Sequence, residues 1–324
     1  MKTTIIFSLL LFICLIQGCV SPNSFPLKGE KKMVLNNSER VLSVTSLSSY
    51  QPILLETNDN SLIKDINRMY CYEDTLFVFD RFMKKIILFN KRDGTYINTI
   101  SHVGQGPGEY VKAMDFCIDS QNKRIIITCD IPYKLLFYSF SGDLQKEVSL
   151  PLYYSEIVTN GTYLYGLIDD EDNSKIDILD YNGNQINSIS IPNKKLKIDT
   201  PELKHTFAKG HRMAVYKDSI YFTCPYDNSI YTIKEEELYK KYEIDFKEYT
   251  LPEHLLNEEL NAKDFSMQCK KNSWVCTILD IIQSSDSLFF RTNSGFFLCN
   301  KENNSMTNYR ILSLPNIGGT PFTA

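Results

Sequence analysis

Short apolar runs that recur in groups of four predict an all-β fold of the β-propeller type. In the first group the runs cover residues 65–72, 75–80, 85–90 and 95–100. Further groups begin near Ala113, Tyr154, His211 and Cys276, and they are rich in the Ile, Val, Phe, Tyr and Thr that favour strands. A unit of four strands that returns every few tens of residues is the sequence signature of a propeller blade.

The predicted hairpin turns support this repeat because they occur at equivalent places. Gly, Asn and Asp cluster between the third and fourth runs, at residues 92–94, 141–143 and 181–184. After the fifth group only residues 313–324 remain, which are too few for another four-stranded blade. We therefore expect the last blade to be incomplete and the chain to be cut short.

The N-terminus predicts an exported protein that lipid holds on a membrane. Lys2 precedes an apolar stretch at residues 5–16, which is too short to span a bilayer but has the length of a signal-peptide core. Gly18 and Cys19 then look like a bacterial lipobox, so we expect residues 1–18 to be cleaved and Cys19 to carry the lipid. A plain secretory signal with an incidental cysteine is the alternative.

We expect residues 19–40 to form the lipid anchor and a flexible tether, and residues 41–324 to form the propeller. Residues 41–47 and 53–56 alternate between apolar and polar side chains, as strands do. We expect them to complete the last blade and close the ring. Between the fourth and fifth groups, residues 247–274 form an insertion with one predicted helix, for which Thr250 is the candidate N-cap.

The cysteines do not predict a disulfide framework. Of the nine, Cys14 lies in the signal peptide and Cys19 in the lipobox, which leaves an odd number. Cys117 and Cys129 lie on adjacent predicted strands, but in the expected hairpin register their side chains point from opposite faces of the sheet. We interpret the remaining cysteines as buried free thiols.

The most distinctive segment, residues 102–110, joins the first and second groups and reads HVGQGPGEY. Gly104, Gly106 and Gly108 allow positive φ and a close backbone approach, and Pro107 stiffens the turn. No predicted helix follows to offer its N-terminus to a phosphate group. The segment is therefore interpreted as a structural connector between two blades.

This G-x-G-P-G-E-Y motif, preceded by Leu54-Leu55-Glu56 and by residues 61–63, resembles the six-bladed β-propeller lipoproteins common in Gram-negative gut anaerobes. The likeness covers nearly the whole mature chain. Residues 316–322 look like that family's Gly-Gly-x-Pro-Phe segment, which precedes further blade sequence there. The resemblance implies six blades, export and a lipid anchor, and it implies no particular activity.

No residue pattern predicts a catalytic or metal site. The acidic run at residues 169–173 lacks the glycine that a calcium loop needs at its sixth position, and it is interpreted as a solvated hairpin turn. The histidines, His102, His205, His211 and His254, lack the paired spacing of zinc sites. Propeller lactonases assemble a metal site from single carboxylates on several blades, so a metal-dependent lactonase or lyase, with calcium as the candidate ion, is the alternative function.

The function that we predict is binding rather than catalysis. A formal net charge of −4 offers no basic surface to nucleic acid. We expect a lipid-anchored module of a Gram-negative cell envelope that binds or scaffolds a glycan, a peptide or an envelope protein. No acidic run follows Cys19, which favours the periplasmic side of the outer membrane over the cell surface. We expect His102, Glu109 and Tyr110 to be exposed near the channel mouth and to contact the ligand.

Overall fold

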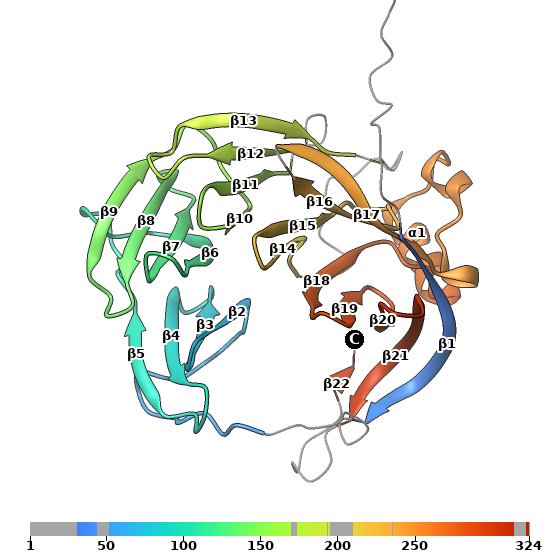
Figure 1. Ribbon diagram of the computed structural model, residues 1–324, viewed down its shortest axis with the longest axis horizontal. Coiled ribbons are helices and arrows are strands. Elements are labelled where there is room, and N and C mark those ends of the chain that lie inside the picture. The colour runs from blue at the N-terminus through green and yellow to red at the C-terminus, as the bar shows by residue number, and fades with distance from the viewer. Residues whose placement is uncertain are drawn as a thin grey trace, which may run out of the picture.

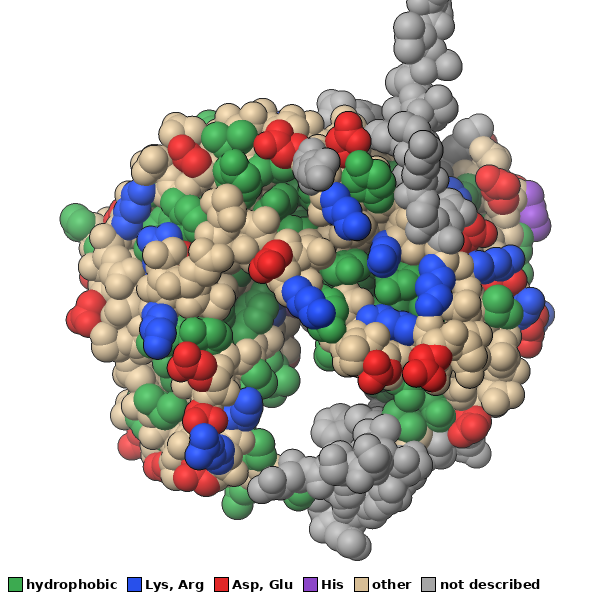
Figure 2. Space-filling view, viewed as in Figure 1, with side chains coloured by type: hydrophobic (Ala, Val, Ile, Leu, Met, Phe, Trp, Pro, Cys, Tyr) green, Lys and Arg blue, Asp and Glu red, His purple; other side chains and the backbone are tan. Residues whose placement is uncertain are grey.

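The computed structural model describes residues 31–43, 52–169, 174–192, 194, 210–234, 236–313 and 322–323. Within these residues, short antiparallel sheets follow one another around a common centre, as in a propeller (Figure 1). The space-filling view shows an opening in the middle, between β2 and β18 (Figure 2). No helix in the described ranges is long and apolar enough to cross a membrane.

Five four-stranded units, which we name blades I to V, occupy the described part of the chain. Blade I contains β2 (Arg68–Tyr72), β3 (Thr75–Asp80), β4 (Lys85–Asn90) and β5 (Tyr96–Ile100). Blade II contains β6 (Ala113–Asp119), β7 (Arg124–Cys129), β8 (Lys134–Ser139) and β9 (Leu144–Ser149). Blade III contains β10 (Glu156–Thr159), β11 (Leu164–Ile168), β12 (Lys175–Leu179) and β13 (Gln185–Ser190).

The last two blades share one continuous sheet. Blade IV contains β14 (Met213–Tyr216), β15 (Ser219–Thr223), β16 (Ser229–Lys234) and β17 (Glu237–Asp245). Blade V contains β18 (Ile278–Gln283), β19 (Ser287–Thr292), β20 (Phe296–Asn300) and β21 (Ser305–Ser313). A short strand, β22 (Phe322–Thr323), pairs with β21.

The predicted all-β, propeller-like architecture is confirmed, and each predicted group of four runs becomes one antiparallel meander. Blade II also has the predicted register, with Cys117 opposite Ile126. Cys117 and Cys129 are both free, and they pack into different apolar clusters. A sixth, incomplete blade stays a prediction, because residues 44–51 and 314–321 lie outside the described ranges.

The hydrophobic core is divided among the spaces between neighbouring blades. Phe79 of blade I packs with Phe116 of blade II, at a ring centroid distance of 5.6 Å. Equivalent clusters join blade II to blade III and blade III to blade IV. Side chains of both sheet faces are therefore buried, which explains why most second and third strands read as continuous apolar runs.

The first strand shows that the predicted boundary of the tether and the predicted way of closing the ring are wrong. β1 (Lys31–Ser43) begins well before the expected boundary at residue 41 and pairs in parallel with β17 and β21. It joins the outer strands of blades IV and V (Figure 1), because Met33 and Leu35 are buried in the cluster between these blades. Residues 53–56, also predicted as a strand, form none and lie against blade I, where the Glu56 N–H donates to the Gly94 carbonyl at 2.9 Å.

The helical insertion between blades IV and V is confirmed, but its helix starts later than predicted. It contains η3 (Lys247–Tyr249), η4 (Glu253–Leu256) and α1 (Ala262–Asn272). Thr250 does not cap α1. Instead the Asn261 side chain accepts the N–H of Asp264 at 2.9 Å, which is ordinary N-cap geometry.

The alternation of strand direction divides the connections between two faces of the ring. Turns between the second and third strands of a blade lie at the end where its first strand begins, and so do the connections from one blade to the next. We call this end the crossover face. It carries residues 101–112, residues 150–155 and the helical insertion.

Candidate functional site

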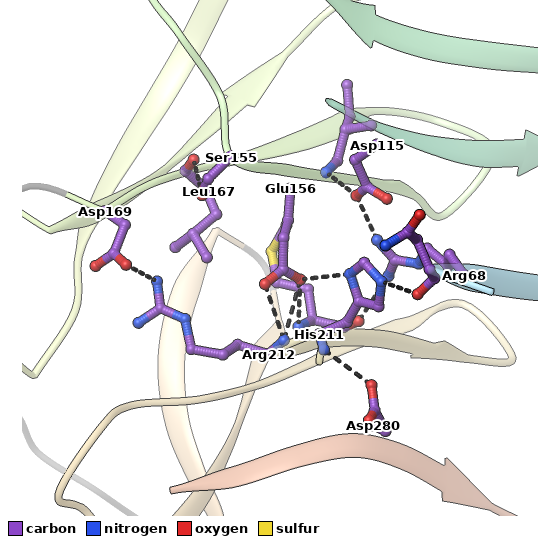
Figure 3. A network of polar contacts seen from close by, with 12 residues as sticks. Arg68, Asp115, Ser155, Glu156, Leu167, Asp169, His211, Arg212 and Asp280 are labelled. Atoms are coloured by element: carbon purple, nitrogen blue, oxygen red, sulfur yellow. Dashed lines mark hydrogen bonds and ion pairs between the residues drawn. The ribbon is translucent and has the colours of Figure 1, made fainter. Parts of the chain in front are cut away.

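Charged side chains in or just before the first strands of all five blades meet near the ring axis, at the crossover end of these strands (Figure 3). We call this group the axial cluster, and it consists of Arg68, Asp115, Glu156, His211, Arg212 and Asp280. The strands that hold these residues are the innermost ones of the ring (Figure 1). The cluster therefore lies where a ligand that entered the crossover face along the axis would arrive.

Arg68 connects blade I to blades II and IV. Its guanidinium forms an ion pair with Asp115, and Nη2 donates to the Met213 carbonyl at 2.9 Å. Asp115 Oδ2 also accepts the N–H of Ile157 at 2.9 Å, which adds blade III. Arg68 and Asp115 are 8% and 0% exposed. A buried pair of this kind needs such additional hydrogen bonds to offset the loss of hydration.

Glu156 holds the start of β14. Its Oε1 accepts the N–H of Arg212 at 2.9 Å, and its Oε2 accepts the N–H of Met213 at 3.0 Å. The Arg212 side chain returns to blade III, where Nη2 lies 3.1 Å from Asp169 Oδ2. Blades III and IV are thus joined by charged groups at the axis in addition to their apolar cluster.

His211 reaches three further blades. Its Nε2 lies 2.8 Å from the Asn67 carbonyl of blade I and must donate to it, so Nε2 carries the proton. Its Nδ1 lies 3.8 Å from Glu156 Oε2 of blade III. Its backbone N–H donates to Asp280 Oδ1 of blade V at 2.8 Å, and the Asp280 N–H donates back to the His211 carbonyl at 2.8 Å.

The charges of the axial cluster favour the ionised form of Glu156 and the protonated form of His211. Burial alone would raise the pKa of Glu156, but His211, Arg68 and Arg212 lower it to about 2. Burial and the Arg68 charge would lower the pKa of His211, but the Glu156 and Asp115 carboxylates outweigh them and raise it. Glu156 is therefore ionised at neutral pH.

The polar atoms of the axial cluster are mostly used in contacts between blades. Asp115 Oδ1, His211 Nδ1 and the nearby Tyr70 hydroxyl are the buried atoms of this region that lack a hydrogen-bond partner. No group of three or more His, Cys, Asp or Glu in the described residues is arranged to hold a metal ion. The contacts observed are those of a clamp that fixes the five inner strands.

A second feature of the crossover face is a group of exposed apolar side chains on blades I to III. They are between 41 and 62% exposed, and we name them the apolar rim: Ile66, Phe82, Met83, Ile131, Tyr133 and Leu152. Apolar side chains that form one continuous exposed patch are typical of interaction surfaces, whereas single exposed apolar side chains are ordinary.

The apolar rim is accompanied by charged and aromatic neighbours. Lys64 Nζ lies 3.1 Å from the centroid of the Phe82 ring, a cation–π contact. The rings of Tyr133 and Tyr153 are 6.0 Å apart. Burial and the Asp130 charge raise the pKa of Tyr153 to about 12, against the opposite effect of the Arg81 charge. The β7–β8 turn of blade II therefore lies next to the connection to blade III.

Two of the residues predicted to contact a ligand hold the connector loop together. Tyr110 is 1% exposed rather than exposed as predicted, and its hydroxyl donates to the Lys84 carbonyl at 2.8 Å. Glu109 Oε2 accepts the N–H of Gly106 at 2.8 Å. A Cβ at Gly104 would lie 1.9 Å from Glu109 Oε2, so the carboxylate occupies the space that this glycine leaves.

The same loop is anchored to blade II. His102 Nε2 donates to the Gly142 carbonyl at 3.0 Å, and its ring stacks on Tyr138 with centroids 4.9 Å apart. Gly108, at φ 71°, donates its N–H to Glu147 at 2.6 Å. Pro107 lies in the turn between these contacts. Direct contact of His102 or Glu109 with a ligand stays a prediction.

The sequence interpretation missed the axial cluster, although a signal for it exists. At least one charged or imidazole side chain recurs at or near the start of the first strand in each blade. Cys19, residues 1–18, His205 and most of the acidic run at 169–173 lie outside the described residues.

Comparison with known proteins identifies a family. The model of a family described as a domain of unknown function (DUF4934) matches residues 31–319. No curated protein matches the chain.

A solved structure shares the architecture. A protein of Bacteroides fragilis that is assigned as exported has a TM-score of 0.67 and 18% sequence identity, covering 86% of this chain and 80% of its own. A protein of unknown function from Bacteroides caccae has a TM-score of 0.45 and 8% identity, covering 72% and 78%. BamB from Moraxella catarrhalis has a TM-score of 0.42 and 11% identity, covering 78% and 69%. At 18% identity, the likeness to the Bacteroides fragilis protein shows the fold alone.

Proposed function

We propose, from the premise that this chain belongs to the DUF4934 family of domains of unknown function, that it is an exported, lipid-anchored propeller that binds a protein partner without catalysis. The observation that carries the proposal is the apolar rim on the crossover face. The axial cluster beneath it would keep the blades in fixed positions, so that the rim presents a rigid surface.

The size of the apolar rim suits a protein partner. Aromatic side chains bury roughly 150–250 Å² each, so Phe82 and Tyr133, at about half exposure, together offer on the order of 200 Å² of apolar surface, to which the four aliphatic side chains add. A typical partner covers about 800 Å² of each protein, with an apolar centre and a polar edge. Lys64 and Arg81 would belong to that edge. Acidic and basic side chains are interspersed over the face shown in Figure 2, which favours a protein over nucleic acid.

We propose a role without catalysis because the carboxylates of the axial cluster are engaged in contacts within and between blades. Asp115 and Glu156 accept hydrogen bonds from a guanidinium or from backbone N–H groups of neighbouring blades. Asp280 is bound to Arg291, with Nη2 and Oδ2 2.6 Å apart. A metal-dependent lactonase would need several of these oxygens for calcium, and would have to release them from contacts that hold the ring.

Export and anchoring rest on residues 1–18 and on Cys19, and the exported Bacteroides fragilis protein of similar fold supports them. Replacing Cys19 by Ala should move the protein from the membrane fraction to the soluble periplasmic fraction. Cys14→Ala, within the apolar part of the signal, is the matched control and should leave the protein on the membrane. Membrane retention of Cys19→Ala would contradict the lipid anchor.

A sixth blade belongs to the same proposal. On blade V, Leu288, Phe290 and Phe297 face blade IV and are buried. On the opposite face, Ile282 is 64% exposed and Phe289 is only partly buried. A further sheet between blade V and blade I would cover this face. A crystal structure that shows strands stacked between blade V and blade I would support a sixth, incomplete blade, and direct packing of blade V on blade I would contradict it.

The binding proposal is tested by photo-crosslinking in the producing cell. A photoreactive amino acid replaces Phe82 or Tyr133 in the rim, and Ile186 of β13, which is 49% exposed and outside the rim, serves as the control. Both rim positions should crosslink to the same envelope protein, which the Ile186 position should not reach. If Phe82 and Tyr133 crosslink to the same molecules as Ile186, the proposal is refuted. If the rim positions crosslink to a glycan and not to a protein, the choice of partner is refuted.

A further inference from the structure

Two buried cysteines face each other where α1 ends and the chain turns toward β18. Cys276 Sγ lies 3.3 Å from Cys269 Sγ, and the two residues are 2% and 1% exposed. They pack in the apolar cluster of the helical insertion together with Phe265 and Leu255. We propose that Cys269 and Cys276 form a disulfide bond in the exported protein.

The backbone on both sides of this pair is held in place. The N–H of Trp274 donates to the Cys269 carbonyl at 3.0 Å, in the left-handed turn that ends α1. The Cys276 N–H donates to Asn293 Oδ1 at 2.7 Å, and its carbonyl accepts the N–H of Tyr226 at 2.7 Å. A disulfide needs sulfurs about 2.05 Å apart, so the two side chains share a movement of only about 1.3 Å.

The contact between the two thiols also changes the pKa of each. The hydrogen bond from the Cys276 thiol lowers the pKa of Cys269, and the same contact raises the pKa of Cys276. Both shifts belong to the packed contact, so in the unpacked chain either thiol can attack as a thiolate.

The reaction consumes an external disulfide, such as that of an envelope thiol–disulfide oxidoreductase. One of the two cysteines, as a thiolate, attacks this disulfide and forms a mixed disulfide, which releases one thiol. The sulfur of the other cysteine then displaces the second thiol and forms the Cys269–Cys276 bond. Two cysteine thiols are oxidised and one external disulfide is reduced to two thiols, so protons and electrons balance.

Burial determines when this exchange takes place. An oxidant cannot reach sulfurs that are 1 and 2% exposed, so the bond forms before the insertion is fully packed. Once the bond is folded in, it resists reductants for the same reason. The result ties the C-terminus of α1 to the chain that leads into blade V.

A peptide map of the full chain, exported in Gram-negative cells, tests the proposal directly. Cells are lysed under denaturing conditions with N-ethylmaleimide, so that free thiols are alkylated. The protein is then cleaved with trypsin. Lys270 and Lys271 stand between the two cysteines, so cleavage separates them. The disulfide then appears as peptides 264–270 and 272–291 joined together, two hydrogen atoms lighter than their sum.

Refolding provides the second readout. Protein refolded with oxidised glutathione should melt on the order of 5 °C above protein refolded with a reductant, because the bond closes a short loop. Cys276→Ser should abolish both the joined peptides and this difference, whereas Cys299→Ser, at another buried cysteine, should keep both. The proposal is overturned if N-ethylmaleimide modifies Cys269 and Cys276 in the exported protein and after oxidative refolding.

Discussion

Replacing Arg68 by Met is predicted to cost about 3–5 kcal/mol of folding stability, the usual range when one partner of a buried ion pair is removed. Methionine keeps the apolar stem but loses the guanidinium that neutralises Asp115 and donates to the Met213 carbonyl. Asp115, which is 0% exposed, would keep the N–H of Ile157 but lose its counter-charge. The melting temperature should fall by roughly 10 °C.

The matched control is Arg92→Met. Arg92 donates to Asp74 at 3.0 and 2.6 Å, but the two side chains are 75 and 55% exposed. An exposed pair contributes about 0–1 kcal/mol, so this variant should unfold almost as the wild type does. Urea unfolding followed by circular dichroism measures both. Adding Asp115→Asn to Arg68→Met should restore part of the loss, and an Arg68→Met effect no larger than that of Arg92→Met would refute the reasoning.

Three further predictions concern the axial cluster, the connector loop and the candidate ion. The pKa of His211 is raised in the folded state, so its charge stabilises the fold fully below the unfolded pKa of about 6.5, and this stabilisation is lost as pH rises through the folded pKa. His211→Gln should therefore reduce the dependence of the melting temperature on pH over this range. A pH dependence equal to that of the wild type would contradict this prediction. Glu109→Ala removes the acceptor of the Gly106 N–H and should lower the free energy of unfolding by about 1 kcal/mol, whereas unchanged stability with weaker partner binding would favour the ligand role. Calcium and a chelator should leave the melting temperature unchanged, and a chelator-reversible rise with calcium would instead support the lactonase alternative.

The blades could be predicted from sequence because burial on both faces makes their second and third strands continuous apolar runs. β1 could not, because it is an outer strand in which Met33 and Leu35 are buried between polar neighbours. Its first residues therefore have the composition of a tether. The start of α1 was missed because Thr250, the candidate N-cap, precedes the separate 3-10 turn η4, whereas α1 begins after Asn261.

The candidate site was harder to predict than the fold. Glycine and proline make the connector loop conspicuous in sequence, but they explain its shape rather than a function. The axial cluster brings Arg68, Asp115, Glu156 and His211 together from four blades, and no two of these share a motif. Its pattern is one polar residue per repeat with a different side chain each time, which becomes a site only when the ring aligns the strands.

The measurement that tests the central claim most directly is the affinity of the crosslinked partner, once purified, for the wild type and for two charge variants. Phe82→Asp places a carboxylate in the apolar rim, at a side chain that is 62% exposed, and Ile186→Asp does the same outside it. Both variants should melt as the wild type does, since exposed substitutions change stability little. Phe82→Asp should weaken binding at least about tenfold, as expected for a central apolar contact, and Ile186→Asp should not. Equal affinity of the two variants for the partner would contradict the account.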